Sequence, residues 1–541
     1  MKILLLQPPI QDFYDTDVRL QPLGLAYLKA TIKLHFPNIE VIVKDYHSGF
    51  PKKTIPYPSE MNYLKNFYVG RDKGPFSSFD QYYHFGADFD YIMSDIKNIA
   101  PNLIGISSLF SPYYEEVLTI SSLIKNYQNI PIIIGGPHAT VLPEFMLKND
   151  SIDFVIRGEG EKAFTQFIFE FMNEKKWENV QNLSFKKGNL IIQNPIKENF
   201  SIDEIPLPNL EDLDKSNYEY NKEPLTFILS SRGCPYKCDF CSINSMYNNK
   251  FFPRSPDKII AEMTTRHEEG YRVFDFEDDN LTYNKTKAIE LFNKITNKFP
   301  NGDVKLVAMN GISYLHLDQD ILSAMKKAGF SDLNLSLVSN NGEFNKLNSR
   351  PFDLEKFQAI VSYAKTLGFN ITAYQIIGHP EDSIASMIET LVYLATLPVL
   401  IGASIFYLIK DTGIEKRYPL TSAQEIKLGR LTSIYQKKYP FNQSDIFTLF
   451  ITTRIINFLK SGLFKDDQAN LSDLLRSPTL DNRVQIGMEQ LQSIFQGQGY
   501  YIHNKKGKTL VKTFNTDLFK NIFKKIPSIN TQDSQIIVND I

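Results

Sequence analysis

The chain has 541 residues, more than one hydrophobic core supports, which predicts about two to four domains. Hydrophobic residues make up 43% of the chain and charged residues 22%, values that are typical of a soluble globular protein. The formal net charge of −2 gives no positive field to attract nucleic acid or an anionic membrane, so we expect no nucleic-acid partner.

Short apolar runs alternate with helical patterns through residues 1–195, which we predict to form the first domain. The predicted strands cover residues 2–7, 40–46, 103–109, 130–136 and 153–160, and the helices cover 23–36, 88–99, 113–127 and 161–172. This alternation predicts an α/β domain with a doubly wound, Rossmann-like parallel sheet. Ligands of such sheets bind beyond the carboxyl ends of the strands, where "GISS", "IGGPHAT" and "RGEGE" lie.

Residues 47–87 interrupt this alternation with a long insertion that is rich in aromatic side chains. Loops of this length usually have a function or are disordered, and the aromatic content argues against disorder. Two interpretations remain open: the insertion covers an edge of the sheet, or it covers a bound ligand.

Residues 196–222 are polar and contain several prolines, so we interpret them as a linker. From residue 223 the alternation resumes and gives six strand–helix units up to residue 420, fewer than the eight of a complete barrel. The predicted strands cover residues 225–231, 272–279, 305–311, 332–338, 370–378 and 402–409. Residues 421–541 are predicted to be mainly helical and contain no chemical motif.

The segment 391–409 is apolar and long enough to span a bilayer. Pro398 and Gly402 interrupt it, and no cluster of Lys and Arg flanks it, so we interpret it as a helix end, a turn and a buried strand. The N-terminal run "KILLL" stops at Pro8 and is read as a buried strand rather than a secretory signal. We therefore expect a cytoplasmic protein without a membrane span.

The three cysteines of the chain, Cys234, Cys238 and Cys241, all lie in "SSRGCPYKCDFCSI". An odd number of clustered thiols does not form a secreted disulfide framework. A structural zinc site normally has four ligands, and the nearest downstream histidine is His267. Three thiolates can instead hold a four-iron cubane and leave one iron open for chemistry. The alternative is three unrelated buried thiols.

The spacing Cys-x3-Cys-x2-Cys after the first strand of a βα series, with Phe240 before the last cysteine, resembles the radical S-adenosylmethionine (SAM) superfamily. The resemblance implies a partial (β/α)6 barrel over residues 223–420. It also implies a [4Fe–4S] cluster on the three cysteines, whose open iron binds SAM. Reductive cleavage of SAM would yield a 5′-deoxyadenosyl radical, which requires an electron donor such as flavodoxin or ferredoxin.

Further positions agree with this resemblance to different degrees. "FEDDNLT" resembles "F-x-DD-x-F-T" of the cobalamin-linked branch and implies that Glu277, Asp278 and Asp279 receive the SAM ammonium group. The alternative is that these acids form a helix N-cap cluster. On the fourth strand, Ser336 and Ser339 stand where the family often has a ribose-binding Glu. On the fifth strand, "QIIGHPEDS" keeps Gly378 of the family pattern, and on the sixth, "LIKDTG" lacks the proline of "PGT".

The segments "PLGLAYL", "IIIGGPHAT" and "DFVIRGEGE" resemble the cobalamin-binding (B12-binding) domain that precedes the barrel in one radical SAM subfamily. The glycines allow a flat macrocycle to approach the backbone closely. We predict cobalamin contacts from Ser107, Ser108, Gly135, Gly136, Pro137, His138, Ala139, Thr140, Gly158, Glu159 and Gly160.

The cobalt-ligating motif Asp-x-His-x-x-Gly is matched incompletely in "DYHSGF". Its glycine comes one residue early, which favours a loop role for His47 over cobalt ligation. His138 is the better candidate for a cofactor contact, as part of a polar wall.

These features predict a cobalamin-dependent radical SAM enzyme that methylates an unactivated carbon of a small molecule by way of methylcobalamin and a 5′-deoxyadenosyl radical. A first alternative is a radical SAM enzyme that catalyses ring rearrangement, cyclisation or carbon–carbon coupling. A second alternative is a cobalamin or iron–sulfur sensor without turnover. The sequence identifies no substrate.

Overall fold

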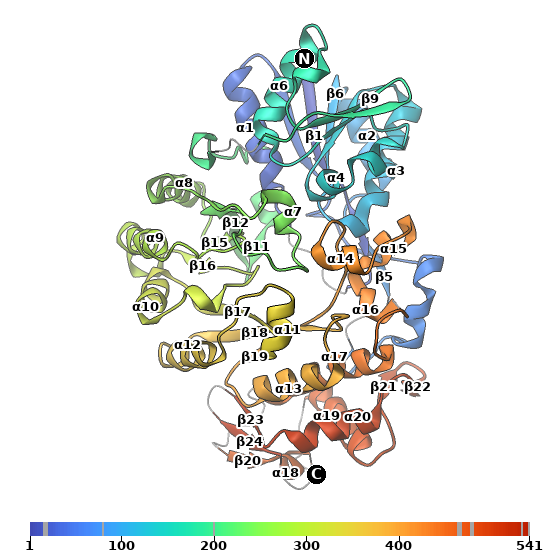
Figure 1. The fold of residues 1–541 in the computed structure, drawn as a ribbon, viewed down its shortest axis with the longest axis vertical. Coiled ribbons are helices and arrows are strands. Elements are labelled where there is room, and N and C mark those ends of the chain that lie inside the picture. The colour runs from blue at the N-terminus through green and yellow to red at the C-terminus, as the bar shows by residue number, and fades with distance from the viewer. Residues whose placement is uncertain are drawn as a thin grey trace.

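The computed structural model describes residues 1–14, 20–77, 81–197, 201–435, 437–461, 468–475, 481–531 and 534–538. The N-terminal domain, the barrel and the C-terminal region follow one another along the long axis of the molecule (Figure 1). The fold is α/β in the first two parts and mainly helical in the third, as the sequence predicted.

The N-terminal domain is built on a seven-stranded sheet in the order β10-β9-β8-β7-β6-β1-β3. The parallel strands are β1 (Lys2–Gln7), β3 (Glu40–Asp45), β6 (Leu103–Ser107), β7 (Ile132–Gly135) and β8 (Phe154–Ile156). An antiparallel pair, β9 (Leu183–Lys187) and β10 (Leu190–Gln193), extends one edge. The parallel strands follow the order 2-1-3-4-5 of flavodoxin-like sheets, whose ligands bind where the winding reverses, here between β1 and β6.

Alternate side chains of β1 enter two separate cores, because successive residues of a strand point to opposite faces. Ile3 and Leu5 pack with α1 (Leu23–His35) and α6 (Gly160–Met172). Leu4 and Leu6 pack with α2 (Phe89–Ile99) and α3 (Tyr114–Tyr127). The sheet is therefore covered by helices on both faces, which confirms the doubly wound prediction.

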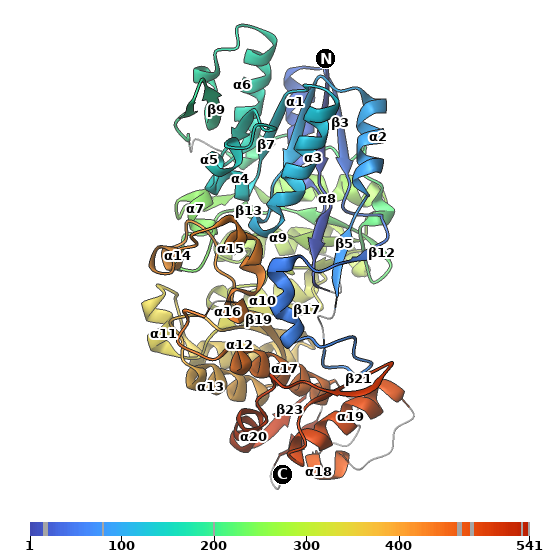
Figure 2. The ribbon, with the colours of Figure 1, turned by 90° about the vertical axis from the view of Figure 1, so that its right-hand side faces the viewer.

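The insertion of residues 47–87 forms a small antiparallel sheet and then extends toward the C-terminal region. Strand β5 (Tyr82–Phe85) pairs with β2 (Ile10–Asp12) and β4 (Lys53–Ile55). The amide of Lys73 donates to the carbonyl of His503 (2.8 Å), and the amide of His503 donates to Asp72 (2.8 Å). Figure 2 shows this segment passing beside α17 to reach β21. The choice between an edge cover and a ligand cover stays a prediction.

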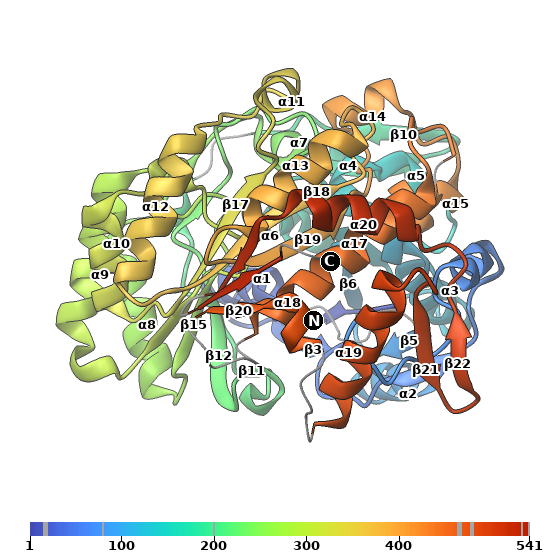
Figure 3. The ribbon, with the colours of Figure 1, turned by 90° about the horizontal axis from the view of Figure 1, so that it is seen from below.

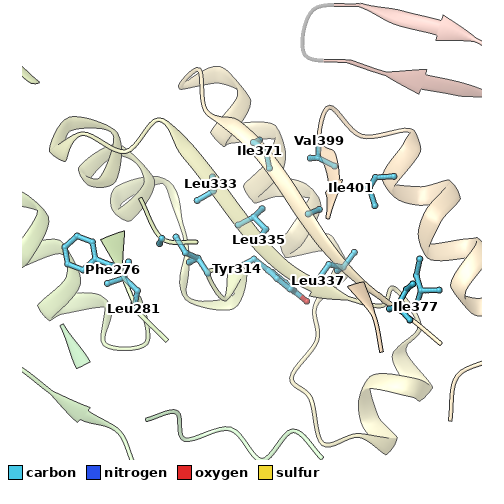
Figure 4. Close-up of a cluster of buried hydrophobic side chains, with 14 of the residues drawn as sticks. Phe276, Leu281, Tyr314, Leu333, Leu335, Leu337, Ile371, Ile377, Val399 and Ile401 are labelled. Atoms are coloured by element: carbon cyan, nitrogen blue, oxygen red, sulfur yellow. The ribbon is translucent and has the colours of Figure 1, made fainter. Parts of the chain in front are cut away.

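Six parallel strands form the partial barrel. They are β12 (Glu223–Ile228), β15 (Val273–Phe276), β16 (Lys305–Val307), β17 (Asp332–Val338), β18 (Asn370–Ile377) and β19 (Leu400–Ile405). Single parallel bridges, Leu306–Phe330 and Ile312–Leu335, connect the two halves. Leu333, Leu335 and Leu337 of β17 lie in the apolar layer under the helices, together with Ile371 and Ile377 of β18 (Figure 4).

As the predicted strand–helix units require, helices connect these strands: α8 (Pro256–Glu268), α9 (Lys285–Lys298), α10 (Gln319–Ala328), α12 (Leu354–Thr366) and α13 (Ile384–Ala395). The segment 391–409 contains the end of α13, a turn and β19, as the sequence predicted, but the strand is only partly buried, because Leu400 is exposed and only Ile401 and Ile405 are fully covered. Among the described residues, no helix combines the length and apolarity that crossing a membrane requires.

The sixth helix of the barrel comes late in the chain. Helix α17 (Gln443–Lys460) packs against β19, and the side chain of Asn457 hydrogen-bonds both the amide and the carbonyl of Ile401 (2.8 Å each). The ammonium group of Lys460 donates to the carbonyls of Leu394, Leu397 and Val399 at the end of α13. Helix α17 thus completes the barrel although it lies beyond residue 420. The domain boundary that we placed after residue 420 stays a prediction.

The remaining C-terminal elements form a helical layer below the barrel (Figure 3). They include α19 (Asn482–Phe495), α20 (Thr516–Lys525) and the hairpin of β21 (Tyr501–Asn504) and β22 (Gly507–Leu510). The predicted linker, 196–222, is packed rather than extended, because Leu210, Leu213 and Tyr218 are buried.

Candidate functional site

The three cysteines lie on one loop between β13 (Ser231–Arg232) and the short helix α7 (Ile243–Tyr247), at the carboxyl end of the first barrel strand. Cys238 is buried, and Cys234 and Cys241 are half-buried. The amide of Cys241 donates to the carbonyl of Cys238 (3.0 Å), which closes a tight turn between them. The structure therefore brings all three thiols to one loop.

Burial raises the pKa of Cys238, and it raises the pKa of Cys241 to about 12. Thiols in such a place stay protonated at neutral pH unless a cation compensates the thiolate charge, and iron ions supply that compensation. In the described part of the chain, no group of three or more His, Cys, Asp or Glu side chains is arranged to hold a single metal ion. A cubane differs, because each of its thiolates binds a different iron.

Two of the acids that are predicted to bind SAM anchor the cysteine loop, and their contact with SAM stays a prediction. Asp278 accepts hydrogen bonds from the amide of Ser230 (3.1 Å) and from the hydroxyls of Ser230 and Ser231, and Asp279 accepts from the amide of Gly233 (2.8 Å). Burial raises the pKa of Asp278 to about 6 although these donors lower it. The alternative of a helix N-cap cluster is not observed, because Asn284 caps α9.

Glu277 has a different environment from the two aspartates. Its carboxylate accepts a hydrogen bond from Asn310 (2.6 Å), and it lies close to Asp275. Burial, together with the smaller effect of the negative charge of Asp275, raises the pKa of Glu277 to about 8. Of the three acids, Glu277 is the one that does not hold the loop, and its contact with SAM stays a prediction.

The fourth and fifth strands approach the same loop. Arg350 donates to the hydroxyl and carbonyl of Ser336 on β17, and its other nitrogen lies 4.0 Å from the sulfur of Cys238. Phe240 lies edge-on to His379, which follows Gly378 at the end of β18, with ring centroids 5.8 Å apart. Gly378 has φ +86°, and a Cβ there would lie 2.6 Å from Ser433. Its observed role is therefore close packing against α16 (Thr432–Tyr435).

A cavity of about 320 Å³ lies beyond the carboxyl ends of β1, β6, β7 and β8. Of the predicted cobalamin contacts, those that line it are Ser107, Gly135, Gly136, Pro137, Gly158, Glu159 and Gly160. Only glycine fits at position 136, because φ is +109° and a Cβ on Gly136 would lie 2.7 Å from the carbonyl oxygen of Ser108. The position matches the reversal point at which sheets of this order bind ligands.

The other four predicted contacts, Ser108, His138, Ala139 and Thr140, are not among the lining residues. The hydroxyl of Thr140 accepts from the amide of Gly158 (2.8 Å) and donates to the carbonyl of Gly136 (2.9 Å), so it joins the two glycine turns. His138 is buried between the rings of Tyr114 and Phe145, and burial lowers its pKa to about 4. The structure thus places His138 behind the cavity rather than in its wall. His47 is buried after β3 and also does not line the cavity.

Three buried polar atoms in the cavity wall have no hydrogen-bond partner: Gln7 Oε1, Gln21 Nε2 and the hydroxyl of Tyr27. These side chains are only 2%, 5% and 2% exposed. Unpaired polar atoms this deep are costly for the folded chain. The glycine turns in the cavity wall leave space for a ligand to approach the backbone closely, which fits the flat macrocycle of cobalamin. Sequence reasoning missed all three, although Gln7 is a polar residue at the carboxyl end of a buried strand.

The carboxylates of "RGEGE" pair with the cysteine loop. Arg232 forms ion pairs with Glu159 and, at 2.9 Å, with Glu161, and its guanidinium lies 5.2 Å from the ring centre of Tyr27. Burial raises the pKa of Glu159, and the charge of Arg232 opposes that rise. Arg232 was not among the predicted site residues. The signal that could have identified it is its position directly before Gly233 and Cys234.

Family comparisons agree with this geometry. The radical SAM superfamily model matches residues 228–394, and the B12 binding domain model matches residues 77–168. The fold and the cysteine loop thus define a radical SAM enzyme. The chain contains a radical SAM domain and a B12-binding domain, and these two domains imply a [4Fe–4S] cluster, SAM and cobalamin as cofactors.

Curated relatives include an uncharacterized methyltransferase of Pyrococcus horikoshii, which is 27% identical over 299 residues, or 54% of this chain and 64% of that protein. The cytidylyl-2-hydroxyethylphosphonate methyltransferase of Streptomyces wedmorensis is 24% identical over 416 residues, or 70% of this chain and 73% of that protein. The chain therefore spans less than two thirds of the length of the Pyrococcus relative.

Two solved structures share the fold. The cobalamin-dependent SAM radical enzyme OxsB, with aqua-cobalamin and SAM bound, gives a TM-score of 0.61 at 13% identity, over 97% of this chain and 78% of that one. The radical SAM methyltransferase TsrM of Kitasatospora setae, with cobalamin and a [4Fe–4S] cluster bound, gives 0.58 at 14% identity, over 76% of each chain.

Proposed function

We propose that this enzyme transfers a methyl group to an unactivated carbon of a small molecule. The observation that carries the proposal is the shared cavity, because the sheet of the B12-binding domain and the segment that bears the three cysteines form walls of one space. The relatives that are named as methyltransferases support transfer of a methyl group rather than another radical reaction.

When bound, the cofactors supply an adenosyl radical that removes a hydrogen atom from the substrate and a methyl group that takes its place. The chain's own residues position these groups. Cys234, Cys238 and Cys241 would hold the cluster, and Asp278 and Asp279 fix the loop on which the cysteines lie. A cofactor bound in this largely apolar cavity would displace water from it, which protects reactive species from side reactions. An external electron donor, such as flavodoxin or ferredoxin, belongs to the same proposal.

The test is anaerobic incubation of the cluster- and cobalamin-loaded protein with a chemical reductant and SAM whose methyl group is deuterated. We expect S-adenosylhomocysteine, 5′-deoxyadenosine and deuterium in the recovered cobalamin. 5′-Deoxyadenosine without S-adenosylhomocysteine would replace the proposal by a non-methylating radical enzyme. Neither product would replace it by a cobalamin or iron–sulfur sensor.

A further inference from the structure

The segment that carries the cysteines also forms part of the corrinoid cavity. Leu229 and Arg232 precede the first cysteine, Met246 and Tyr247 follow the last, and all four line the cavity. The opposite wall comes from β1, α1 and the glycine turns after β7 and β8. A ligand in this cavity therefore touches the cysteine segment on both sides of the three thiols.

Arg232 connects the cysteine segment to the N-terminal domain. Its side chain is 7% exposed, and it pairs with Glu159 and Glu161 at the start of α6 and stacks on Tyr27 of α1. All four of these residues line the cavity. A buried guanidinium depends on such partners, because losing one leaves an uncompensated charge away from water. Arg232 therefore holds one end of the cysteine segment against the N-terminal domain.

The same end of the segment is tied to the barrel. Ser231 donates to Asp278 and Gly233 donates to Asp279, so the residues on either side of Arg232 are fixed to the end of β15. Gly233 has φ +81°, and a Cβ there would lie 2.3 Å from the carbonyl oxygen of Lys250, so this close approach of the two backbone segments requires glycine. A change in the position of Arg232 therefore reaches Cys234 through one tightly held residue.

We propose that Arg232 is a positioning residue that couples the corrinoid cavity to the cysteine loop, so that binding of cobalamin and assembly of the cluster strengthen each other. This inference rests on the proposed function, because it takes cobalamin as the ligand of the cavity. A corrinoid in the cavity removes water from the Arg232 pairs and orders Met246 and Tyr247, and a cluster orders the same segment from its other face. Each ligand then pays less of the ordering cost when the other is already bound.

The first measurement is the dissociation constant of hydroxocobalamin by absorbance titration under anaerobic conditions. It compares the reconstituted wild-type protein with a variant in which Cys234, Cys238 and Cys241 are all replaced by alanine. We expect the cluster-free protein to bind hydroxocobalamin at least about 5-fold more weakly, the lower end of usual coupling between sites. A difference below about 2-fold overturns the inference.

The second measurement repeats this comparison with Arg232→Lys, which keeps the charge and loses the two-pronged contact. We expect the cluster to have little effect on hydroxocobalamin affinity in that background. Arg254→Lys is the matched control, because Arg254 is also buried and pairs with Glu262 but does not line the cavity. If Arg232→Lys does not fold, Glu161→Gln removes one partner of Arg232 and takes its place.

A second readout is the electron paramagnetic resonance spectrum of the cluster under excess reductant, which keeps the cluster reduced and also reduces the added hydroxocobalamin. The signal of the cluster, separated from that of cob(II)alamin, should change on addition of hydroxocobalamin in the wild type and not in Arg232→Lys. Two results would show that Arg232 is merely structural. One is equal coupling between cluster and hydroxocobalamin binding in the wild type and in Arg232→Lys. The other is a loss of that coupling in Arg254→Lys as large as in Arg232→Lys. If the wild type binds no hydroxocobalamin, the proposed function fails and the inference with it. If it forms both products but shows no coupling, the inference alone fails.

Discussion

Cys238 is the most buried of the three thiols, and the chain has no other cysteine to replace it. We predict that Cys238→Ala abolishes cluster assembly and 5′-deoxyadenosine formation, because two thiolates do not hold a cubane with one open iron. Iron and sulfide content and product chromatography measure both effects. Ser242→Ala, a change of similar size in the same loop, should retain the cluster, and a cluster retained by Cys238→Ala would contradict the assignment.

A substitution at Gly136 tests whether the cavity binds cobalamin. We predict that Gly136→Ala weakens hydroxocobalamin binding and destabilises the fold by ~1–3 kcal/mol, because φ +109° is strained for alanine and the Cβ would collide with Ser108. Absorbance titration and chemical denaturation provide the two readings. The control is Gly188→Ala, which has φ +60° but open space around the new Cβ. Equal loss of affinity in both variants would attribute the effect to backbone strain alone.

Glu116 on α3 gives a pH prediction. Burial raises its pKa from 4.5 to about 8, so between these values the folded chain keeps a proton that the unfolded chain releases. The free energy of unfolding should therefore fall as pH rises from 4.5 to about 8. Glu116→Gln should flatten this slope and stabilise the protein at about pH 9 by at least ~1.4 kcal/mol, the equivalent of one pKa unit.

Urea denaturation at several pH values measures this effect of Glu116. Glu115→Gln, at a half-exposed neighbour that pairs with Lys427, should reduce the slope much less, because the charge of Glu115 contributes less than burial to the raised pKa of Glu116. An unchanged slope in Glu116→Gln would show that other groups cause the pH dependence.

Individual residues also show how far sequence reasoning reaches. The cysteine site and the glycine turns could be predicted, because the residues that form each of them are close together in the sequence. Glu159 was predicted as a cofactor contact, but its pairing with Arg232 joins residues that lie 73 positions apart, and no local pattern encodes that contact. His138 was predicted as part of the polar wall, and the direction of its side chain depends on packing against Tyr114 that the sequence does not reveal.

Among the elements, α17 makes the clearest testable contribution. Its Asn457 pairs with the amide and carbonyl of Ile401 on β19, which is the last strand of its sheet. We predict that Asn457→Ala lowers the free energy of unfolding by ~2 kcal/mol, because two backbone groups lose their partners. Chemical denaturation measures the change, and Asn62→Ala at an exposed site is the control. Equal stability of Asn457→Ala and the wild type would show that α17 is not required to complete the barrel.

The elements of both sheets could be predicted because each has a continuous apolar run or a helical period. The role of α17 could not, because it follows β19 only after the short helices α14 (Gly413–Arg417), α15 (Ala423–Lys427) and α16. A helix that joins a barrel from a distance has the same local pattern as one in a separate domain. The insertion is similar, since its contacts with β21 join Asp72 to His503 across the whole chain.

At the scale of the whole molecule, residues of the B12-binding domain and of the segment that carries the cysteines line one cavity. The B12-binding domain directs the carboxyl ends of its strands toward the loop that carries the cysteines, and Arg232 fixes the boundary between them. The acidic anchors Asp278 and Asp279 hold this loop from the barrel side. Binding of the substrate between these parts is what the proposed methyl transfer requires.

The central claim is that three thiolates hold a four-iron cluster whose fourth iron is open to SAM. The most direct measurement is the electron paramagnetic resonance spectrum of the anaerobically reconstituted, reduced protein before and after addition of SAM. Our account predicts a signal of a reduced [4Fe–4S] cluster that changes when SAM binds the open iron. A spectrum that SAM leaves unchanged, or a protein that is purified with zinc in place of iron, would contradict it.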